Sequence, residues 1–124
     1  MTPALRELGN GQAANLPREA ARKIARPFAE PRLDWIHYPG GESWRMMVER
    51  VAGFLDRMDA EMDGRGGALL LVHAASAMAA INWFLGDPWR PLSFRLAPCA
   101  ISHLALNRWG ERAMLKHNDE AHLA

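Results

Sequence analysis

His73 lies where open α/β sheets bind their ligands. It follows an unbroken apolar run, Ala68 to Val72, which is typical of a strand covered on both faces. From Ser76 to Gly86 apolar residues recur at helical spacing, so a helix is expected there. A titratable side chain between a buried strand and a helix faces the crevice that such folds use for binding. The free N–H groups near Ala74 to Ala77 would favour an anion at the same place.

Both His73 and a second candidate, Glu7, have a simpler interpretation. A lone histidine at the end of a strand is often a hydrogen-bonded structural residue, and this stretch alone does not decide between the two. Glu7 precedes the loop residues Gly9, Asn10 and Gly11, where a carboxylate is ordinarily a solvated surface group. The rest of the sequence favours a functional role for His73.

Composition limits the class of protein. The chain has 124 residues, 49% of them apolar and 23% charged, which fits one globular domain over residues 1–124. The net charge is +1 with no basic cluster, so a nucleic-acid partner is not indicated. No apolar run is long enough to span a membrane. The single cysteine, Cys99, fits a reducing, cytoplasmic compartment. No His or Cys pair has metal-ligand spacing, and neither a metal nor a cofactor is expected.

The expected elements mix helices and strands. A short helix is predicted over 19–25 and an irregular cover over 27–41. Ser43 is a natural N-cap for a long helix with one apolar stripe from Trp44 to Met62. Alternation over 100–106 and 112–117 predicts a C-terminal β-hairpin. The order indicates an α/β fold, but only 68–72 reads as a buried strand, and a sheet needs neighbours.

Several motifs, in order along the chain, resemble the histidine phosphatase superfamily, the phosphoglycerate-mutase-like phosphatases. They are Leu5-Arg6-Glu7 followed by Gly9 and Gly11, then Pro39-Gly40-Gly41-Glu42-Ser43 opening the long helix, then Val72-His73-Ala74-Ala75, and the tail Asn118-Asp119-Glu120-Ala121-His122-Leu123. Each motif alone is weak, but the four together cover most of the chain. The resemblance implies an incomplete three-layer α/β/α phosphoglycerate-mutase-like fold with a C-terminal β-hairpin, a single truncated domain.

The resemblance also implies roles for individual residues. Glu7 would be the proton donor and acceptor for the leaving group, and His73 would donate hydrogen bonds to phosphoryl oxygens. The Ala74 N–H would bind phosphate beside it. The resemblance implies a phosphorylated small molecule as the substrate. Phosphoryl transfer depends mostly on positioning and charge stabilisation, so a histidine, helix N–H groups and a carboxyl group suit it.

The family nucleophile is missing from the sequence. It is a histidine in an Arg-His-Gly motif, and none of the five histidines here has those neighbours. The Gly-Gly that follows the second family histidine is Ala74-Ala75 here. We therefore expect a chain that is inactive alone. Without the nucleophile strand, the 68–72 segment would keep unpaired backbone groups and bare apolar faces. We expect self-association, or a partner chain, to supply the missing strands.

Three functions remain open from the sequence. The first is a phosphomonoesterase half-site that another chain completes. The second is a non-catalytic protein that binds phosphate through His73 and the adjacent helix. The third is an interaction module that uses Trp35, Tyr38, Trp83 and Trp89 as contact anchors, although simple packing is the favoured interpretation of these aromatic residues.

Overall fold

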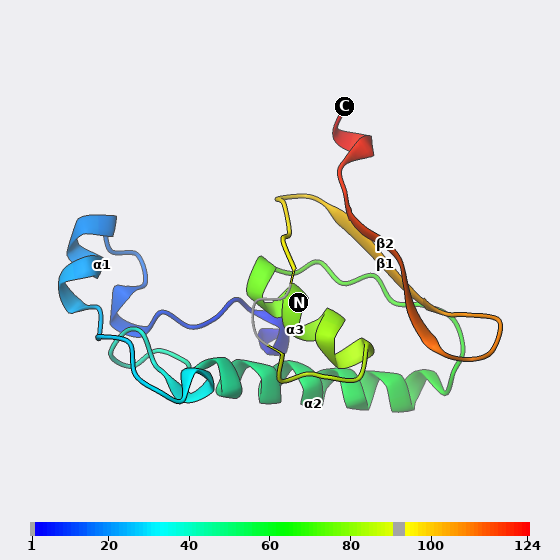
Figure 1. Cartoon of the computed structure of the whole chain (residues 1–124), viewed down its shortest axis with the longest axis horizontal. Coiled ribbons are helices and arrows are strands. Elements are labelled where there is room, and N and C mark those ends of the chain that lie inside the picture. The colour runs from blue at the N-terminus through cyan, green and yellow to red at the C-terminus, as the bar shows by residue number, and fades with distance from the viewer. Residues whose placement is uncertain (1, 91–93) are drawn as a thin grey trace.

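A computed structural model describes residues 2–90 and 94–124 as three α-helices followed by a β-hairpin (Figure 1). The elements are α1 (Arg18–Ile24), α2 (Trp44–Met62), α3 (Ala74–Phe84), β1 (Ile101–Leu106) and β2 (Arg112–Asp119), with short 3-10 turns at Pro3–Leu5, Gly11–Ala13, Arg32–Asp34 and Ala121–Leu123. The predicted mixture of helices and strands is confirmed. Among the helices of the described residues, none is long and apolar enough to cross a membrane.

The long helix α2 forms the base of the molecule (Figure 1). It begins as predicted at Ser43, whose hydroxyl accepts a hydrogen bond from the Met46 N–H at 3.2 Å. This cap satisfies one of the free N–H groups of the first turn. The helix ends at Asp63, which adopts a left-handed conformation with φ of 49°. Its length lets it contact the N-terminal segment, α3 and the hairpin in turn.

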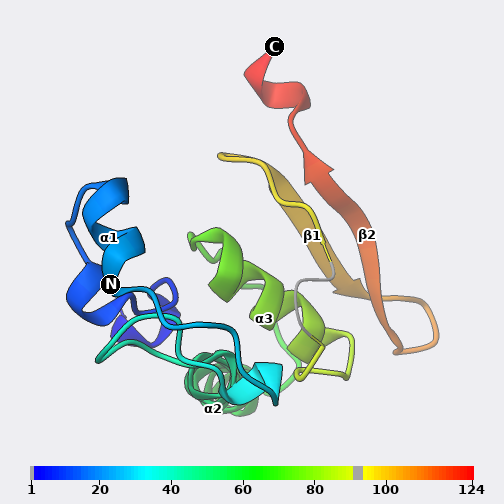
Figure 2. The same ribbon diagram turned by 60° about the vertical axis from the view of Figure 1, so that its left-hand side comes forward.

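The core lies between α2 and α3, which packs across α2 (Figure 2). The predicted stripe of α2 supplies the most deeply buried side chains: Met47, Val48, Val51 and Leu55, each at most 1% exposed. The facing residues of α3 include Met78 and the small residues Ala79 and Ala80. Burying a side chain of the size of leucine or methionine stabilises the fold by roughly 1.5–3 kcal/mol. This contact therefore fixes α3, and with it the position of His73.

The C-terminal hairpin forms where the alternation predicts it. β1 and β2 pair antiparallel, and β2 runs two residues beyond the predicted end at His117. The turn is closed by the Asn107 side chain, whose Oδ1 accepts from the N–H groups of Trp109 and Glu111 at 2.9 and 3.0 Å. Arg112 joins the hairpin to α2 through Asp59 at 3.0 Å and lies over the Trp83 ring. The hairpin is thus held to the helical core by its turn end.

The prediction of a buried strand over 68–72 is wrong. The segment is extended but belongs to no strand, and no backbone hydrogen bond joins it to another described residue. Leu69 and Leu71 are 85% and 88% exposed, while Leu70 packs partly against the core. The apolar run needs a neighbouring strand on each side, and the sheet within 2–90 and 94–124 consists only of β1 and β2. The described residues therefore agree with the expected incomplete phosphoglycerate-mutase-like α/β fold, with the hairpin present and the central sheet missing.

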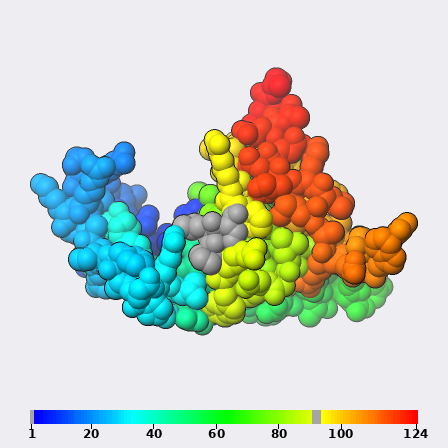
Figure 3. All heavy atoms as spheres, viewed as in Figure 1, coloured from blue at the N-terminus to red at the C-terminus, as the bar shows by residue number. Residues whose placement is uncertain are grey.

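Residues 12–38 form an excursion that carries α1 and stands to one side of a hollow (Figure 3). The predicted helix over 19–25 is confirmed as α1, shifted by one residue. The predicted cover over 27–41 does reach α2, where Arg45 donates to Asp34 at 2.6 Å and Leu33 packs against the core. The two ends of the excursion meet, because the Gln12 N–H donates to the Pro39 carbonyl at 2.9 Å.

Candidate functional site

The amino end of α3 is open to solvent. His73 is the N-cap residue, and its carbonyl accepts from the Ala77 N–H at 2.8 Å and from the Ser76 hydroxyl at 3.1 Å. The side chains of His73 and Ala74 are exposed, whereas Ser76 is fully buried beneath them. The amino end of α3 thus combines an exposed histidine with backbone N–H groups that make no hydrogen bond within the helix. This arrangement suits an anion, since the positive end of the helix dipole lies there.

Glu7, from the N-terminal segment of the chain, contacts the amino end of α3. Its Oε2 accepts a hydrogen bond from the Ala75 N–H at 3.2 Å, and its Oε1 accepts from the Leu8 N–H at 2.8 Å. The structure therefore places Glu7 against the first turn of α3, at the residue two positions beyond His73. The carboxylate already stabilises the N–H groups that an incoming anion would use.

Arg50 holds the segment that carries Glu7. From the middle of α2, its Nη1 donates to the carbonyls of Ala4 at 2.6 Å and Arg6 at 3.2 Å. Its Nη2 lies 3.5 Å from the Glu7 carbonyl. One guanidinium therefore binds several carbonyls of the irregular segment at once, which provides them with hydrogen-bond donors. This contact fixes the backbone of Glu7 against α2.

Glu42 completes the support. Its carboxylate, 9% exposed, accepts from Arg50 Nε at 2.9 Å and Nη2 at 2.8 Å, a bidentate pair. It also accepts from Arg6 Nη2 at 3.0 Å and from the Gly9 N–H at 2.9 Å. Burial raises the pKa of the Glu42 carboxyl, but the hydrogen bonds from Arg50 and Gly9 and the two arginine charges outweigh it, so the pKa lies below its ordinary value. Glu42 is thus held ionised.

Close backbone contact joins the Glu7 loop to the turn before α2. The Glu42 N–H donates to the Gly9 carbonyl at 2.8 Å. A Cβ on Gly41 would lie 2.7 Å from that carbonyl, and a Cβ on Gly11, where φ is +49°, would lie 2.3 Å from the Pro39 carbonyl. Side chains would prevent this approach, so both glycines are required by the contact.

Sequence reasoning missed the roles of Glu42 and Arg50. Both lie in the segment that carries the family resemblance, and their spacing of eight residues was available. The sequence does not reveal the hydrogen-bond partners of the Arg50 guanidinium, because they are carbonyls of residues more than forty positions away. The signal that could have found them is a glutamate just before a helix followed two turns later by an arginine on the same face.

The aromatic residues considered as contact anchors mostly pack within the chain. Trp83 Nε1 donates to Asp56 at 2.8 Å, and Trp35 Nε1 donates to the Pro27 carbonyl at 2.9 Å. Tyr38 stacks on the ring of His37 at 4.1 Å between centroids. Trp89 is 40% exposed, with Arg45 over its ring. These contacts favour the packing interpretation.

Metal binding finds no support in the part of the chain that the structure describes. Among residues 2–90 and 94–124, no group of three or more His, Cys, Asp or Glu side chains could hold a metal ion. Cys99 is exposed and unpaired. The candidate site consists instead of a carboxylate, an imidazole and backbone N–H groups, which suit the binding of an oxyanion and the transfer of a proton.

Comparison with known proteins agrees with the motifs. Searches among curated proteins and among solved structures found no match. A family model described as the histidine phosphatase superfamily (branch 1) matches residues 1–120 of the 124, which includes Glu7, His73 and the hairpin. The chain therefore belongs to the histidine phosphatase superfamily.

Proposed function

We propose that the chain binds the phosphoryl group of a phosphorylated small molecule at the amino end of α3. The observation that carries the proposal is the hydrogen bond from the Ala75 N–H to the Glu7 carboxylate beside the exposed His73. An anionic group already lies on these donors, so the place accepts negative charge. Membership of the superfamily makes a phosphomonoester the favoured ligand.

Each group has a role in this proposal. The His73 imidazole and the N–H groups of Ala74 and Ala75 donate hydrogen bonds to the phosphoryl oxygens. Glu7, once protonated, passes its proton to the alkoxide that leaves when the phosphorus–oxygen bond breaks. Protonation of Glu7 also weakens its hold on the Ala75 N–H, because a neutral carboxyl is the poorer acceptor. The protonated form therefore leaves the Ala75 N–H to the phosphoryl group, and the proton transfer to the alkoxide returns Glu7 to its ionised form.

Phosphoryl transfer would need a nucleophile from another segment. None of the five histidines has the Arg-His-Gly neighbours of the family nucleophile. The 68–72 segment offers backbone groups to which another strand could pair, because no backbone hydrogen bond joins it to a described residue. We propose that a second copy or a partner chain supplies the missing strands, that only a partner chain of different sequence could bring the nucleophile, and that the chain alone does not turn over substrate. A cytoplasmic location fits the free Cys99.

Turnover of p-nitrophenyl phosphate by the purified chain, with His73→Ala as its control, tests the inactivity. We expect no turnover above the rate of the control. Turnover that disappears in His73→Ala would overturn the proposal that the chain is inactive alone.

Titration with inorganic phosphate or vanadate, followed at the ring resonances of His73 by NMR, tests binding. We expect saturable shifts of the His73 ring and of the Ala75 amide in the wild-type chain, and weaker shifts of the Ala75 amide in His73→Ala. Their absence in the wild-type chain would contradict phosphate binding and favour the interaction module. A phosphate-binding protein without catalysis is the second candidate, and the absent nucleophile motif favours it.

A further inference from the structure

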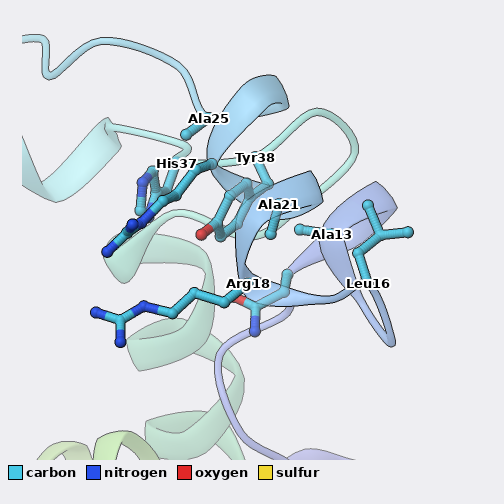
Figure 4. Close-up of a pocket in the computed structure, with 9 residues that line it drawn as sticks. Ala13, Leu16, Arg18, Ala21, Ala25, His37 and Tyr38 are labelled. Atoms are coloured by element: carbon cyan, nitrogen blue, oxygen red, sulfur yellow. The ribbon is translucent and has the colours of Figure 1, made fainter.

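A pocket lies in the excursion that carries α1, away from the candidate site at the amino end of α3. It has a volume of about 410 Å³ and opens between the Gly11–Ala13 turn, α1 and the residues just before Pro39 (Figure 4). Its lining consists of Asn10, Ala13, Leu16, Arg18, Ala21, Arg22, Ala25, His37 and Tyr38. Neither Glu7 nor His73 contributes to it.

Of the described residues that line the pocket, Arg18, Arg22 and His37 are basic, and none carries a carboxylate. Arg18 and Arg22 lie one turn apart on α1, and His37 comes from the segment just before Pro39. Arg22 pairs with Glu19 at 3.0 Å, but both side chains are exposed, so water screens the pair and leaves the arginine available. Arg18 has no ion-pair partner among the described residues. In Figure 4 the side chains of Arg18 and His37 extend to the same side of α1.

Most of the remaining lining is apolar or aromatic, and Asn10 adds one polar side chain. Ala13 and Ala21 are both 8% exposed and form a floor of small side chains. The His37 ring lies between two others, with Tyr38 at 4.1 Å and Trp35 at 4.8 Å between centroids. These stacks restrict the imidazole, so less side-chain freedom is lost when a ligand binds. The pocket therefore pairs a charged rim with a preformed apolar surface.

We propose that this pocket binds a small organic anion, in which a carboxylate or phosphate group lies beside an apolar body. The anionic group would contact Arg18, Arg22 and His37, and the apolar body would lie on Ala13 and Ala21. Planar guanidinium groups suit both anions, because each offers paired oxygens. The inference does not rest on the proposed function, since the two sites share no residue.

Titration of the full ¹⁵N-labelled chain with benzoate, phenyl phosphate and the neutral benzyl alcohol tests the inference. We expect saturable shifts of the Ala21 and Tyr38 amides with at least one of the two anions and none with benzyl alcohol. The anion that binds more tightly identifies the group that the pocket prefers. Shifts with neither anion, or equal shifts with benzyl alcohol, would overturn the proposal.

Variants separate this pocket from the site at α3. Because Arg18 is exposed, Arg18→Gln should keep the fold and weaken the anion titration at least about tenfold, as expected for a lost charge-assisted hydrogen bond. His37→Gln should weaken it as well, whereas Arg57→Gln, which removes an exposed arginine on α2, should leave it unchanged. An unchanged titration in Arg18→Gln and His37→Gln would overturn the proposal. Shifts of Ala75 with phenyl phosphate report the other site and should persist in both variants.

Discussion

The carboxylate of Glu7 accepts a hydrogen bond from the N–H of Ala75, 68 residues further along the chain. A fixed negative charge therefore lies on the donors that the proposed phosphoryl group would use. It stabilises α3 through the helix dipole. A phosphoryl group bound there, as we propose, would compete with the Glu7 carboxylate for the Ala75 N–H.

Glu7→Gln should tighten the binding of inorganic phosphate at neutral pH by about three- to tenfold, because the charge is removed and the amide is a weaker competitor for the Ala75 N–H. The free energy of unfolding should fall by about 0.5–1 kcal/mol as the helix loses its anionic cap. NMR titration and urea unfolding measure the two effects. Glu61→Gln, an exposed charge on α2, is the control and should change neither. Weaker phosphate binding in Glu7→Gln would contradict the competition.

Arg50→Met should lower the free energy of unfolding by about 3 kcal/mol, since it leaves a largely buried carboxylate without its bidentate partner. The same change should shift the Ala75 amide resonance, because the segment carrying Glu7 loses its attachment to α2. Arg57→Met replaces an exposed arginine of the same helix and should stay within about 0.5 kcal/mol of wild type. Equal stability of the two variants would show that the Arg50–Glu42 pair does not support the loop.

The stability of the chain should depend on Glu42 at acid pH. Its pKa is lowered in the folded chain, so the ionised carboxylate stabilises the fold above the ordinary value of 4.5. That contribution is lost as the pH falls below 4.5 and through the lowered folded value. Urea unfolding between neutral pH and about pH 3 should therefore show a smaller acid-induced loss in Glu42→Gln, which starts from a lower stability at neutral pH. If the wild-type chain and Glu42→Gln lost the same stability in acid, other carboxyl groups would be responsible for that loss. The control Glu61→Gln should show the same dependence of stability on pH as the wild-type chain.

Gly11→Ala and Gly64→Ala separate crowding from backbone strain. Both glycines have positive φ, +49° and +69°, so both variants carry the left-handed penalty of about 1–2 kcal/mol. Only at Gly11 would the new Cβ meet another atom, the Pro39 carbonyl oxygen at 2.3 Å, whereas Gly64 has nothing within 4 Å. Gly11→Ala should therefore be less stable than Gly64→Ala by a further 1–3 kcal/mol or so in urea unfolding. Similar losses would mean that the loop can move away from the turn.

Leu71→Asp should reduce association without unfolding the chain. The leucine is 88% exposed, so the free energy of unfolding of the monomer should change by no more than about 0.5 kcal/mol. Light scattering over a range of concentrations should detect assemblies of the wild-type chain and fewer of the variant. Leu55→Ala is the contrasting variant, because that side chain is only 1% exposed; its free energy of unfolding should fall by about 2–5 kcal/mol. A strictly monomeric wild-type chain at high concentration would contradict self-association through this segment.

Elements whose stability is local or amphipathic could be predicted from the sequence. The apolar stripe from Trp44 to Met62 and the cap at Ser43 predict both ends of α2, because helical periodicity and capping depend on residues close together in the chain. The hairpin followed from alternation on both sides of a turn. The 68–72 run failed for a different reason. Its composition is that of a buried strand, but a strand forms only with a partner, and composition cannot supply one.

The sequence predicts which residues belong to the candidate site, but not the hydrogen bonds that hold the Glu7 segment in place. Glu7 and His73 were singled out from motifs, and the structure brings their segments together at α3. The hydrogen bonds that hold Glu7 join residues far apart in the chain, from Arg50 to the carbonyls of Ala4 and Arg6. Such partners are set by the packing of α2 against the N-terminal segment. No local pattern encodes that packing.

The hydrogen bond between Gln12 and Pro39 closes the base of the excursion that carries α1. Because a loop whose ends already meet can change length at little entropic cost, residues 13–38 could be exchanged between related chains as one cassette. Glu7 and α2 lie outside that cassette and would keep their places. Recombination in this stretch would then change the lining of the pocket at α1, for which we propose an organic anion, and would leave the proposed phosphate site at α3 unaltered.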